Sequence, residues 1–368
     1  MAGIYVHVPF CRAKCAYCDF YSIAAEKFME PYSLAVGEEW KARRAELGGQ
    51  GINTIYFGGG TPSSLPRQLF LNIARLFPLD RVEEFTIEVN PEDVNPASVS
   101  LWREAGVNRV SMGVQSLVDE ELKAVGRRHS AAEALAAIEC IRAGGIGNIS
   151  CDLIYGLPGQ TEESWLYSVR KLLSTGISHL SAYSLSYEEG TKLSKWLDEG
   201  RITPVDDDVA CRMYDTLCAC AAEAGFVHYE ISNFALPGFE SKHNSSYWDG
   251  LTPYLGLGPG AHSLDFQGVR RIVPPGLTRY IAKPAESAEI DTESELDRIN
   301  DLIFVSLRTA RGLDLNRLPE ELRRRLLAEA QRFIEEGLLS ISGDRLAIPE
   351  HHWLISDSII RDLLLEED

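Results

Sequence analysis

The sequence has few basic side chains for its length. Lysine and arginine number 36 against 54 aspartates and glutamates, which gives a formal net charge of −18. Nucleic-acid affinity depends largely on clustered Lys and Arg that neutralise phosphates. We therefore expect no nucleic-acid partner, although an acidic protein can still carry a local basic patch.

Long apolar runs are also absent. No uninterrupted apolar stretch approaches the roughly 18 residues that mark a membrane-spanning helix. Met1 to Val8 lacks the basic region and long apolar stretch of a secretory signal. The sequence therefore predicts a cytoplasmic protein without a transmembrane segment, and peripheral membrane contact is left open.

The eight cysteines are distributed unevenly. Three are crowded between positions 11 and 18, and the other five lie at 140, 151, 211, 218 and 220. This distribution indicates a metal site in a reducing compartment rather than a disulfide framework. The scattered five are expected to be free cysteines that behave as small apolar side chains.

Short β-branched and aromatic runs alternate with amphipathic stretches through the first half of the chain. The expected strands are Ile4 to Val8, Thr54 to Phe57, Glu84 to Val89, Arg109 to Val114, Ile149 to Tyr155 and His179 to Leu185. The expected helices include Phe28 to Leu47, Leu65 to Phe77, Ala131 to Ala143 and Glu162 to Thr175. Such crossovers join parallel strands, so the pattern predicts an α/β fold with a full or partial six-unit barrel. A doubly wound sheet has the same local pattern.

The rest of the chain divides into two further parts. After a barrel over residues 1–230, we expect a connecting region at 231–290, rich in glycine, proline and aromatic residues, with a linker from Pro284 to Glu295. Residues 291–368 have helical patterns and a short hairpin around Gly343, which resemble a winged-helix domain. This segment carries 18 acidic and 10 basic side chains, so packing or protein contact is a better interpretation of it than DNA binding.

A cysteine motif follows the first expected strand directly. Cys11, Cys15 and Cys18 are spaced C-x-x-x-C-x-x-C within a short loop. Three thiolates can bind three irons of a 4Fe-4S cluster and leave the fourth iron open to another ligand. A structural zinc site, with His7 as the fourth ligand, is the alternative.

This motif, with an aromatic residue before its last cysteine, resembles the radical S-adenosylmethionine (SAM) superfamily over about residues 3 to 230. The resemblance implies a partial (β/α)6 barrel in which SAM chelates the open iron and is cleaved by one electron from the cluster. It also implies that Tyr17 lies beside the adenine, and the expected cofactor contacts include Tyr5 in the preceding strand.

Polar residues and glycines follow successive strands in the order that such a barrel needs. The glycines of Phe57-Gly-Gly-Gly-Thr61-Pro62 expose backbone groups for close approach to the SAM amino-acid moiety. A carboxylate can accept from ribose hydroxyls, and a guanidinium suits a carboxylate. The expected SAM contacts are Gly59, Gly60, Thr61, Glu88, Gln115, Arg127 and Asp152.

Within the superfamily, Gly113-Val-Gln115-Ser and Asp152-Leu-Ile-Tyr-Gly-Leu-Pro158-Gly-Gln resemble the group of the oxygen-independent coproporphyrinogen III oxidase. Two features depart from the oxidase: Phe20 stands where it has a further cysteine, and only ten residues precede Cys11. The chain is more similar to the HemW-type haem chaperones in its early cluster motif and in the run His243-Asn-Ser-Ser-Tyr247-Trp248.

The resemblance implies a haem role for His243, with Tyr247 and Trp248 in its surroundings. An imidazole is a good axial ligand for haem iron, and aromatic rings offer flat apolar surface to a porphyrin. His262 and His7 are competing ligands. The expected function is haem transfer to acceptor apoproteins, with an electron donor as a further partner and with oligomeric state and enzymatic turnover undetermined.

Two other functions remain open at this point. One is a radical SAM oxidoreductase that, like the coproporphyrinogen oxidase, acts on a tetrapyrrole. The other is a cluster-bearing interaction module without catalysis, which the many apparent SAM contacts disfavour.

Overall fold

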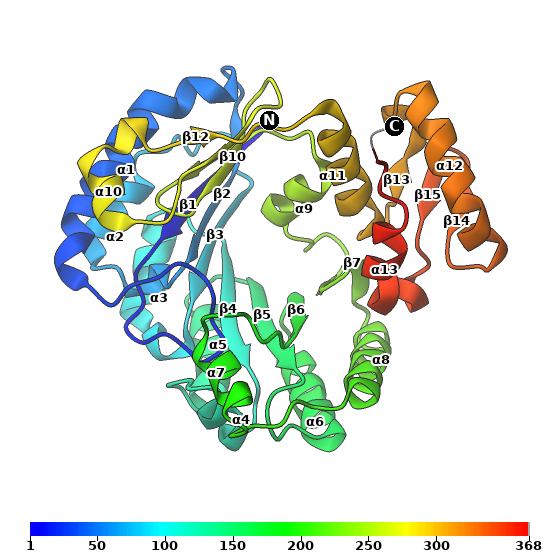
Figure 1. Cartoon of the computed structure of the whole chain (residues 1–368). Helices are drawn as coiled ribbons and strands as arrows, with labels where there is room; N and C mark the ends of the chain where they lie inside the picture. The colour runs from blue at the N-terminus through cyan, green and yellow to red at the C-terminus, as the bar shows by residue number, and fades with distance from the viewer. Residues whose placement is uncertain (367–368) are drawn as a thin grey trace.

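The computed structural model describes residues 1–366, so the last two residues of the expected 291–368 domain lie outside the described residues. A twelve-stranded sheet dominates the chain (Figure 1). Its order is β12-β11-β10-β9-β1-β2-β3-β4-β5-β6-β8-β7. Strands β1 to β6 are mutually parallel, which confirms the expected series of strand–helix units.

The six parallel strands agree closely with those expected. They are β1 Ala2–Val8, β2 Ile52–Gly59, β3 Glu84–Val89, β4 Arg109–Gln115, β5 Asn148–Tyr155 and β6 His179–Ser184. The helices of this part are α1 Met29–Arg43, α2 Arg67–Ala74, α3 Pro96–Glu104, α4 Asp119–Ala124, α5 Ala131–Ala143, α6 Glu162–Leu173, α7 Lys192–Asp198 and α8 Asp207–Glu223. The sheet curves around an interior, as a partial barrel does, with helices on its outside (Figure 1).

The alternation of side chains along the strands separates the core from the barrel interior. In β1, Ile4, Val6 and Val8 belong to the main hydrophobic core, whereas Tyr5 and His7 line a cavity inside the barrel. The other parallel strands alternate in the same way, because successive residues of a strand point to opposite faces. The interior is consequently polar, and polar residues at the strand ends face a common space.

The region expected as a connector and linker is part of the sheet. Strands β7 Val227–Glu230 and β8 Asn233–Ala235 extend it beyond β6, and β9 Tyr254–Leu257 pairs with β1. The remaining elements are α9 Lys242–Asp249, β10 His262–Leu264, β11 Arg270–Ile272, α10 Leu277–Ala282 and β12 Glu289–Ile290. Part of the expected Pro284–Glu295 linker is therefore a strand, since β12 is ordered by its backbone pairing with β11.

The C-terminal segment has its own hydrophobic core, which includes Ile303, Leu326 and Trp353. Its elements are α11 Glu295–Leu307, β13 Leu313–Asp314, α12 Glu320–Glu335, β14 Ser340–Ser342, β15 Arg345–Ala347 and α13 Ser356–Arg361. The expected hairpin is β14–β15, and β13 adds a third strand. A helical domain with a small sheet, as expected, stands beside the barrel (Figure 1).

Candidate functional site

A cavity of about 340 Å³ brings the cysteine motif and most of the expected SAM contacts together at the carboxyl ends of the parallel strands. All three motif cysteines line it. The other predicted residues in its wall are Tyr17, Gly59, Gly60, Thr61, Glu88, Gln115, Arg127 and Asp152. Of the residues predicted to contact the cluster or SAM, Tyr5 alone lies elsewhere, in a second cavity.

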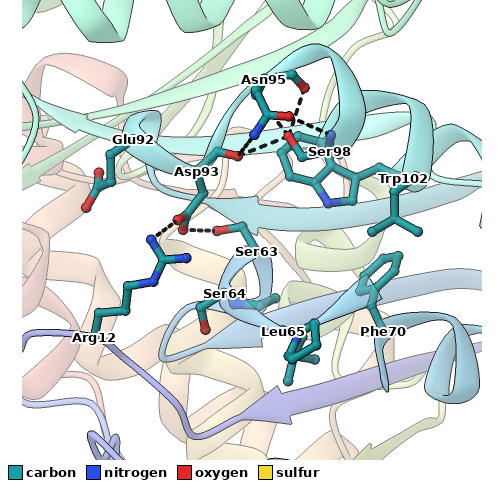
Figure 2. A pocket seen from close by; sticks show the side chains of 13 residues that line it. Arg12, Ser63, Ser64, Leu65, Phe70, Glu92, Asp93, Asn95, Ser98 and Trp102 are labelled. Carbon is teal, nitrogen blue, oxygen red and sulfur yellow. Dashed lines mark hydrogen bonds and ion pairs between the residues drawn. The ribbon is translucent and has the colours of Figure 1, made fainter. Parts of the chain in front are cut away.

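The cysteine loop is tied to the strand ends by polar contacts. Thr61 donates from Oγ1 to Cys11 Sγ at 3.3 Å, and Arg127 Nη1 lies 3.5 Å from Cys15 Sγ. Within the loop, Arg12 forms an ion pair of 2.9 Å with Asp93, which also accepts from Ser63 at 2.7 Å (Figure 2). These contacts hold the loop that carries the thiols against the barrel.

The alternative zinc site with His7 is not supported by the position of His7. Its ring lines the second cavity rather than the one with the cysteines. Nε2 of His7 is 3.0 Å from the Tyr21 carbonyl oxygen, and Nδ1 is 3.2 Å from the Tyr5 hydroxyl. Both ring nitrogens therefore have partners away from the thiols.

Gln115 has a strained backbone at the rim of the cavity. It is the one non-glycine residue with positive φ, at 68°, in the described part of the chain. The pairing of β4 with β5 shifts its register between Gly113 and Gln115. A positive φ at a non-glycine residue costs about 1–3 kcal/mol, and such strained residues are frequent at functional sites. A register shift in a sheet changes the direction in which a side chain points. A Cβ atom at Gly113 would lie 2.8 Å from Gln115 Nε2, so glycine leaves room for this arrangement.

Two carboxyl groups face this cavity from neighbouring parts of the sheet. Glu88 accepts from the Tyr56 hydroxyl at 2.8 Å and from the Gly59 backbone N–H at 3.0 Å. Asp152 accepts from the Ser111 hydroxyl at 3.3 Å. Burial, with a smaller contribution from Asp152, raises the pKa of Glu88 to about 7, and burial raises the pKa of Asp152 to about 6. Paired acceptors in such surroundings suit the hydroxyl groups of a sugar.

The residues present fit a cluster and SAM in their chemistry. Three thiols share one cavity with the Arg127 guanidinium, with carboxyl groups that include Glu88 and Asp152, and with a partly exposed glycine turn. Nε of Arg127 is buried and lacks a hydrogen-bond partner within the described residues, so the guanidinium retains capacity to bind an anionic group.

A second cavity of about 810 Å³ adjoins the first and shares Phe20, Glu88 and Tyr183 with it. The three histidines in its wall are His7, His243 and His262, and the predicted Tyr5, Tyr247 and Trp248 also line it. The cavity therefore gathers the whole of the expected haem motif, together with both competing histidines.

His243 begins the buried face of α9 and is fully covered. Its Nδ1 is 2.9 Å from Thr54 Oγ1, and its Nε2 is 2.8 Å from the Tyr247 hydroxyl. Burial, with a smaller effect of Arg109, lowers the pKa of His243 to about 3, so the ring is neutral. His262 is exposed, and neither of its ring nitrogens has a hydrogen-bond partner within residues 1–366.

Arg109 lies in the barrel interior and was not among the predicted site residues. Its side chain is 1% exposed, and its Nε and Nη1 atoms have no hydrogen-bond partner in the described chain. Its charge lowers the pKa of Glu88 and Asp152 against the effect of burial. The available signal was its position two residues before Ser111, on the inward-facing side of β4. Arg308, which lines the second cavity from the C-terminal domain, had no such signal.

Comparison with known proteins agrees with this geometry. Residues 5–172 match the radical SAM superfamily, and residues 294–355 match the HemN C-terminal domain. The fold matches that of coproporphyrinogen III oxidase (HemN) from Escherichia coli with a TM-score of 0.83 and 21% identity, over 99% of this chain and 90% of that one. The fold and the cysteine site together define a radical SAM protein.

Full-length relatives specify the family. The chain is 35% identical to the heme chaperone HemW of Mycobacterium tuberculosis, over 98% of this chain and 94% of that protein. It is 34% identical to the heme chaperone HemW of Bacillus subtilis, over the full length of both. The chain belongs to the HemW family.

Within residues 1–366, no helix combines the length and apolar character that crossing a lipid bilayer requires.

Proposed function

We propose that this protein is a haem chaperone that binds haem, a 4Fe-4S cluster and SAM and transfers haem to acceptor apoproteins. The observation that carries the proposal is the pair of adjoining cavities, one with the three cysteines and one with the His243 motif. The HemW relatives bear the name of a haem chaperone, which supports the same function for this chain.

In this proposal Cys11, Cys15 and Cys18 hold the cluster, which when reduced supplies the electron for cleavage of SAM. Arg127 and Gln115 hold the amino-acid end of SAM, Glu88 and Asp152 accept from its ribose, and Tyr17 lies beside its adenine. The turn at Gly59, Gly60 and Thr61 leaves backbone groups free for close contact. An electron donor and a cytoplasmic location belong to the same proposal.

Haem occupies the larger cavity, where aromatic rings offer apolar surface to a porphyrin. Ligation by His243 requires that the Tyr247 hydroxyl leave Nε2, because that hydrogen bond occupies the nitrogen. His262 reaches the cavity without breaking a hydrogen bond. Of the three histidines, His262 would therefore hold the haem iron, and His243 would contact haem as part of the cavity wall, together with Tyr5, Tyr247 and Trp248.

The chain division expected from sequence is revised in this proposal. The first hydrophobic core extends from Ala2 to Tyr280, and the second begins at Ile299. Residues 231–290 thus serve the barrel by supplying one wall of the haem cavity, and the C-terminal domain follows from about residue 291.

One experiment separates this function from a tetrapyrrole oxidoreductase. Anaerobically reconstituted protein is loaded with haem and tested in parallel for haem transfer to an apoprotein and for decarboxylation of coproporphyrinogen III. We expect stable haem binding and transfer without decarboxylation. Decarboxylation without stable haem binding contradicts the proposal.

A further inference from the structure

A second group of metal-ligand side chains lies far from the cysteine loop, where the barrel meets the C-terminal domain. Cys218 comes from α8, His228 from β7, and Glu350 from the 3-10 helix Glu350–Ile355. One ligand atom of each residue lies within 4.8 Å of the others. His228 Nδ1 and Glu350 Oε1 are 3.0 Å apart.

Each ring nitrogen of His228 faces an oxygen atom that can only accept a hydrogen bond. Nδ1 faces a Glu350 carboxylate oxygen, and Nε2 lies 3.3 Å from the Ile231 carbonyl oxygen. A neutral imidazole has one N–H, so it can donate to only one of these two oxygens. Phe234 stacks on the ring at 4.0 Å and Trp353 covers its edge at 4.4 Å, and such apolar surroundings favour the neutral form.

A cation beside Nδ1 resolves this conflict. With the proton on Nε2, the ring donates to the Ile231 carbonyl, and the lone pair of Nδ1 points toward Glu350. A hydrogen bond from the second ring nitrogen to a backbone carbonyl is the usual way in which proteins orient a metal-binding histidine.

Tyr214 provides a second and independent observation. Its side chain is 5% exposed, and its hydroxyl lies beside the Cys218 thiol, with no oxygen or nitrogen partner in the described structure. Its ring lies 6.0 Å from that of His228. A thiol is only a weak hydrogen-bond acceptor, so the buried hydroxyl is poorly satisfied, and a metal-bound water or ligand would satisfy it.

We propose that Cys218, His228 and Glu350 bind one zinc ion and so link the barrel to the C-terminal domain, with the Tyr214 hydroxyl hydrogen-bonded to the fourth ligand. Zinc accepts sulfur, imidazole nitrogen and carboxylate oxygen at about 2.0 to 2.3 Å. Glu350 is exposed and Cys218 is partly exposed, so small side-chain rotations bring their donor atoms to these distances.

The test measures zinc on a full-length chain in which Cys11, Cys15 and Cys18 are replaced by Ala, because free motif cysteines would also bind the ion. The protein is incubated with one equivalent of Zn²⁺ and a chelator of micromolar affinity, desalted, and analysed for metal. We expect one zinc per chain. Co²⁺ in place of zinc should give a thiolate charge-transfer absorption band.

Cys218→Ser and Glu350→Gln are the test variants, and Cys211→Ser is the matched control because Cys211 is an exposed cysteine on the same helix. Loss of a ligand should weaken zinc binding by more than about 100-fold, since loss of an outer partner alone costs about 10- to 100-fold. The cobalt band should disappear in Cys218→Ser and persist in Cys211→Ser. Glu350 is on the surface, so its variant tests the site even if Cys218→Ser fails to fold.

Either of two results overturns the proposal. One is that the parent chain retains no zinc against the chelator. The other is that Glu350→Gln and any folded Cys218→Ser protein retain zinc as the parent does. Because the motif cysteines are absent from every protein in the test, its outcome is independent of the cluster, SAM and haem.

Discussion

Arg127 lies between the cysteine loop and the end of β4, with Nη1 at 3.5 Å from Cys15 Sγ and Nη2 at 2.5 Å from the Gly113 carbonyl oxygen. The same Nη2 atom donates to Asn90 Oδ1 at 2.8 Å. One guanidinium thus joins the loop to two strand ends. Its remaining unpartnered nitrogen, Nε, is available beside the thiol groups.

Replacement of Arg127 by Ala should therefore weaken SAM binding. Loss of one hydrogen bond to a charged group costs about 1.5–3 kcal/mol, which corresponds to a ten- to more than a hundredfold higher Kd. Arg127→Lys keeps the charge but loses the planar fork, so its affinity should be intermediate. The measurement is equilibrium SAM binding to cluster-loaded protein, with Arg75→Ala on the outer surface as the control. If Arg127→Ala and Asp152→Ala both bind SAM with wild-type affinity while the cluster is intact, the SAM site lies elsewhere.

The three motif cysteines should each be needed for the cluster. Replacement of Cys11, Cys15 or Cys18 by Ala removes one of only three thiolates, so iron content and iron–sulfur absorption should fall steeply after anaerobic reconstitution. Cys140→Ala, at a partly buried cysteine outside the cavity, should reconstitute like the wild type. A complete 4Fe-4S cluster in the triple Cys11/Cys15/Cys18 variant refutes the assignment.

Local patterns were sufficient to predict the barrel strands. Each has a continuous apolar face toward the helices, and the expected bounds of β3, Glu84 to Val89, agree with the structure at both ends. The short strands β11 and β12 have no such pattern, because none of their side chains is buried. These strands are ordered by backbone pairing with their neighbours in the sheet. Sequence periodicity cannot reveal an edge of this kind.

Functional sites that combine residues distant in sequence are equally hard to predict from local patterns. Cys11, Cys15 and Cys18 are close in sequence, so their common cavity could be predicted from spacing alone. The polar partners of His243 could not, since Thr54 lies 189 positions away and is brought to Nδ1 only by the packing of α9 against β2. Cys218 and Glu350 are separated in the same way, and a scattered cysteine was reasonably expected to be a small apolar side chain.

The raised pKa of Glu88 should appear in the stability of the ligand-free apoprotein. The folded state holds the proton up to about pH 7, whereas the ordinary carboxyl value is 4.5, so the folded protein binds more protons between these values. The resulting stabilisation is complete below about pH 4.5 and is lost as the pH rises through 7. The pKa of Asp152 is raised to about 6, so Asp152 also stabilises the folded apoprotein less as the pH rises.

Glu88→Gln removes this proton uptake because an amide does not titrate. Urea unfolding midpoints of the apoprotein at pH 5 and pH 8 should therefore fall less in Glu88→Gln than in the wild type. Glu133→Gln, an exposed helix-capping carboxylate outside both cavities, serves as the control and should retain the wild-type difference between the two pH values. An equal fall in the wild type and in Glu88→Gln contradicts the raised pKa.

The three histidines of the larger cavity make different predictions for haem. His262 has free ring nitrogens, so His262→Leu should remove the nitrogen that would hold the haem iron and should shift the haem Soret band. His243→Leu removes the partner of the Tyr247 hydroxyl and a ring that stacks on Tyr56 at 5.2 Å, so it should lower haem affinity with a smaller spectral shift. His7→Leu should leave the spectrum of bound haem unchanged, because both ring nitrogens of His7 are already hydrogen-bonded, to the Tyr5 hydroxyl and to the Tyr21 carbonyl oxygen.

Haem titrations of the three variants and the wild type under identical anaerobic conditions separate these roles, with cluster absorption recorded in each protein. Cluster absorption should be the same in all four, since none of the three rings lines the cavity that contains the cysteines. A normal Soret band in His262→Leu, together with its loss in His243→Leu, would assign ligation to His243 after displacement of Tyr247. If haem spectra and affinities are unaltered in both His262→Leu and His243→Leu, haem does not bind through these histidines in this cavity. His7 is the one other histidine that lines the cavity in the described part of the chain.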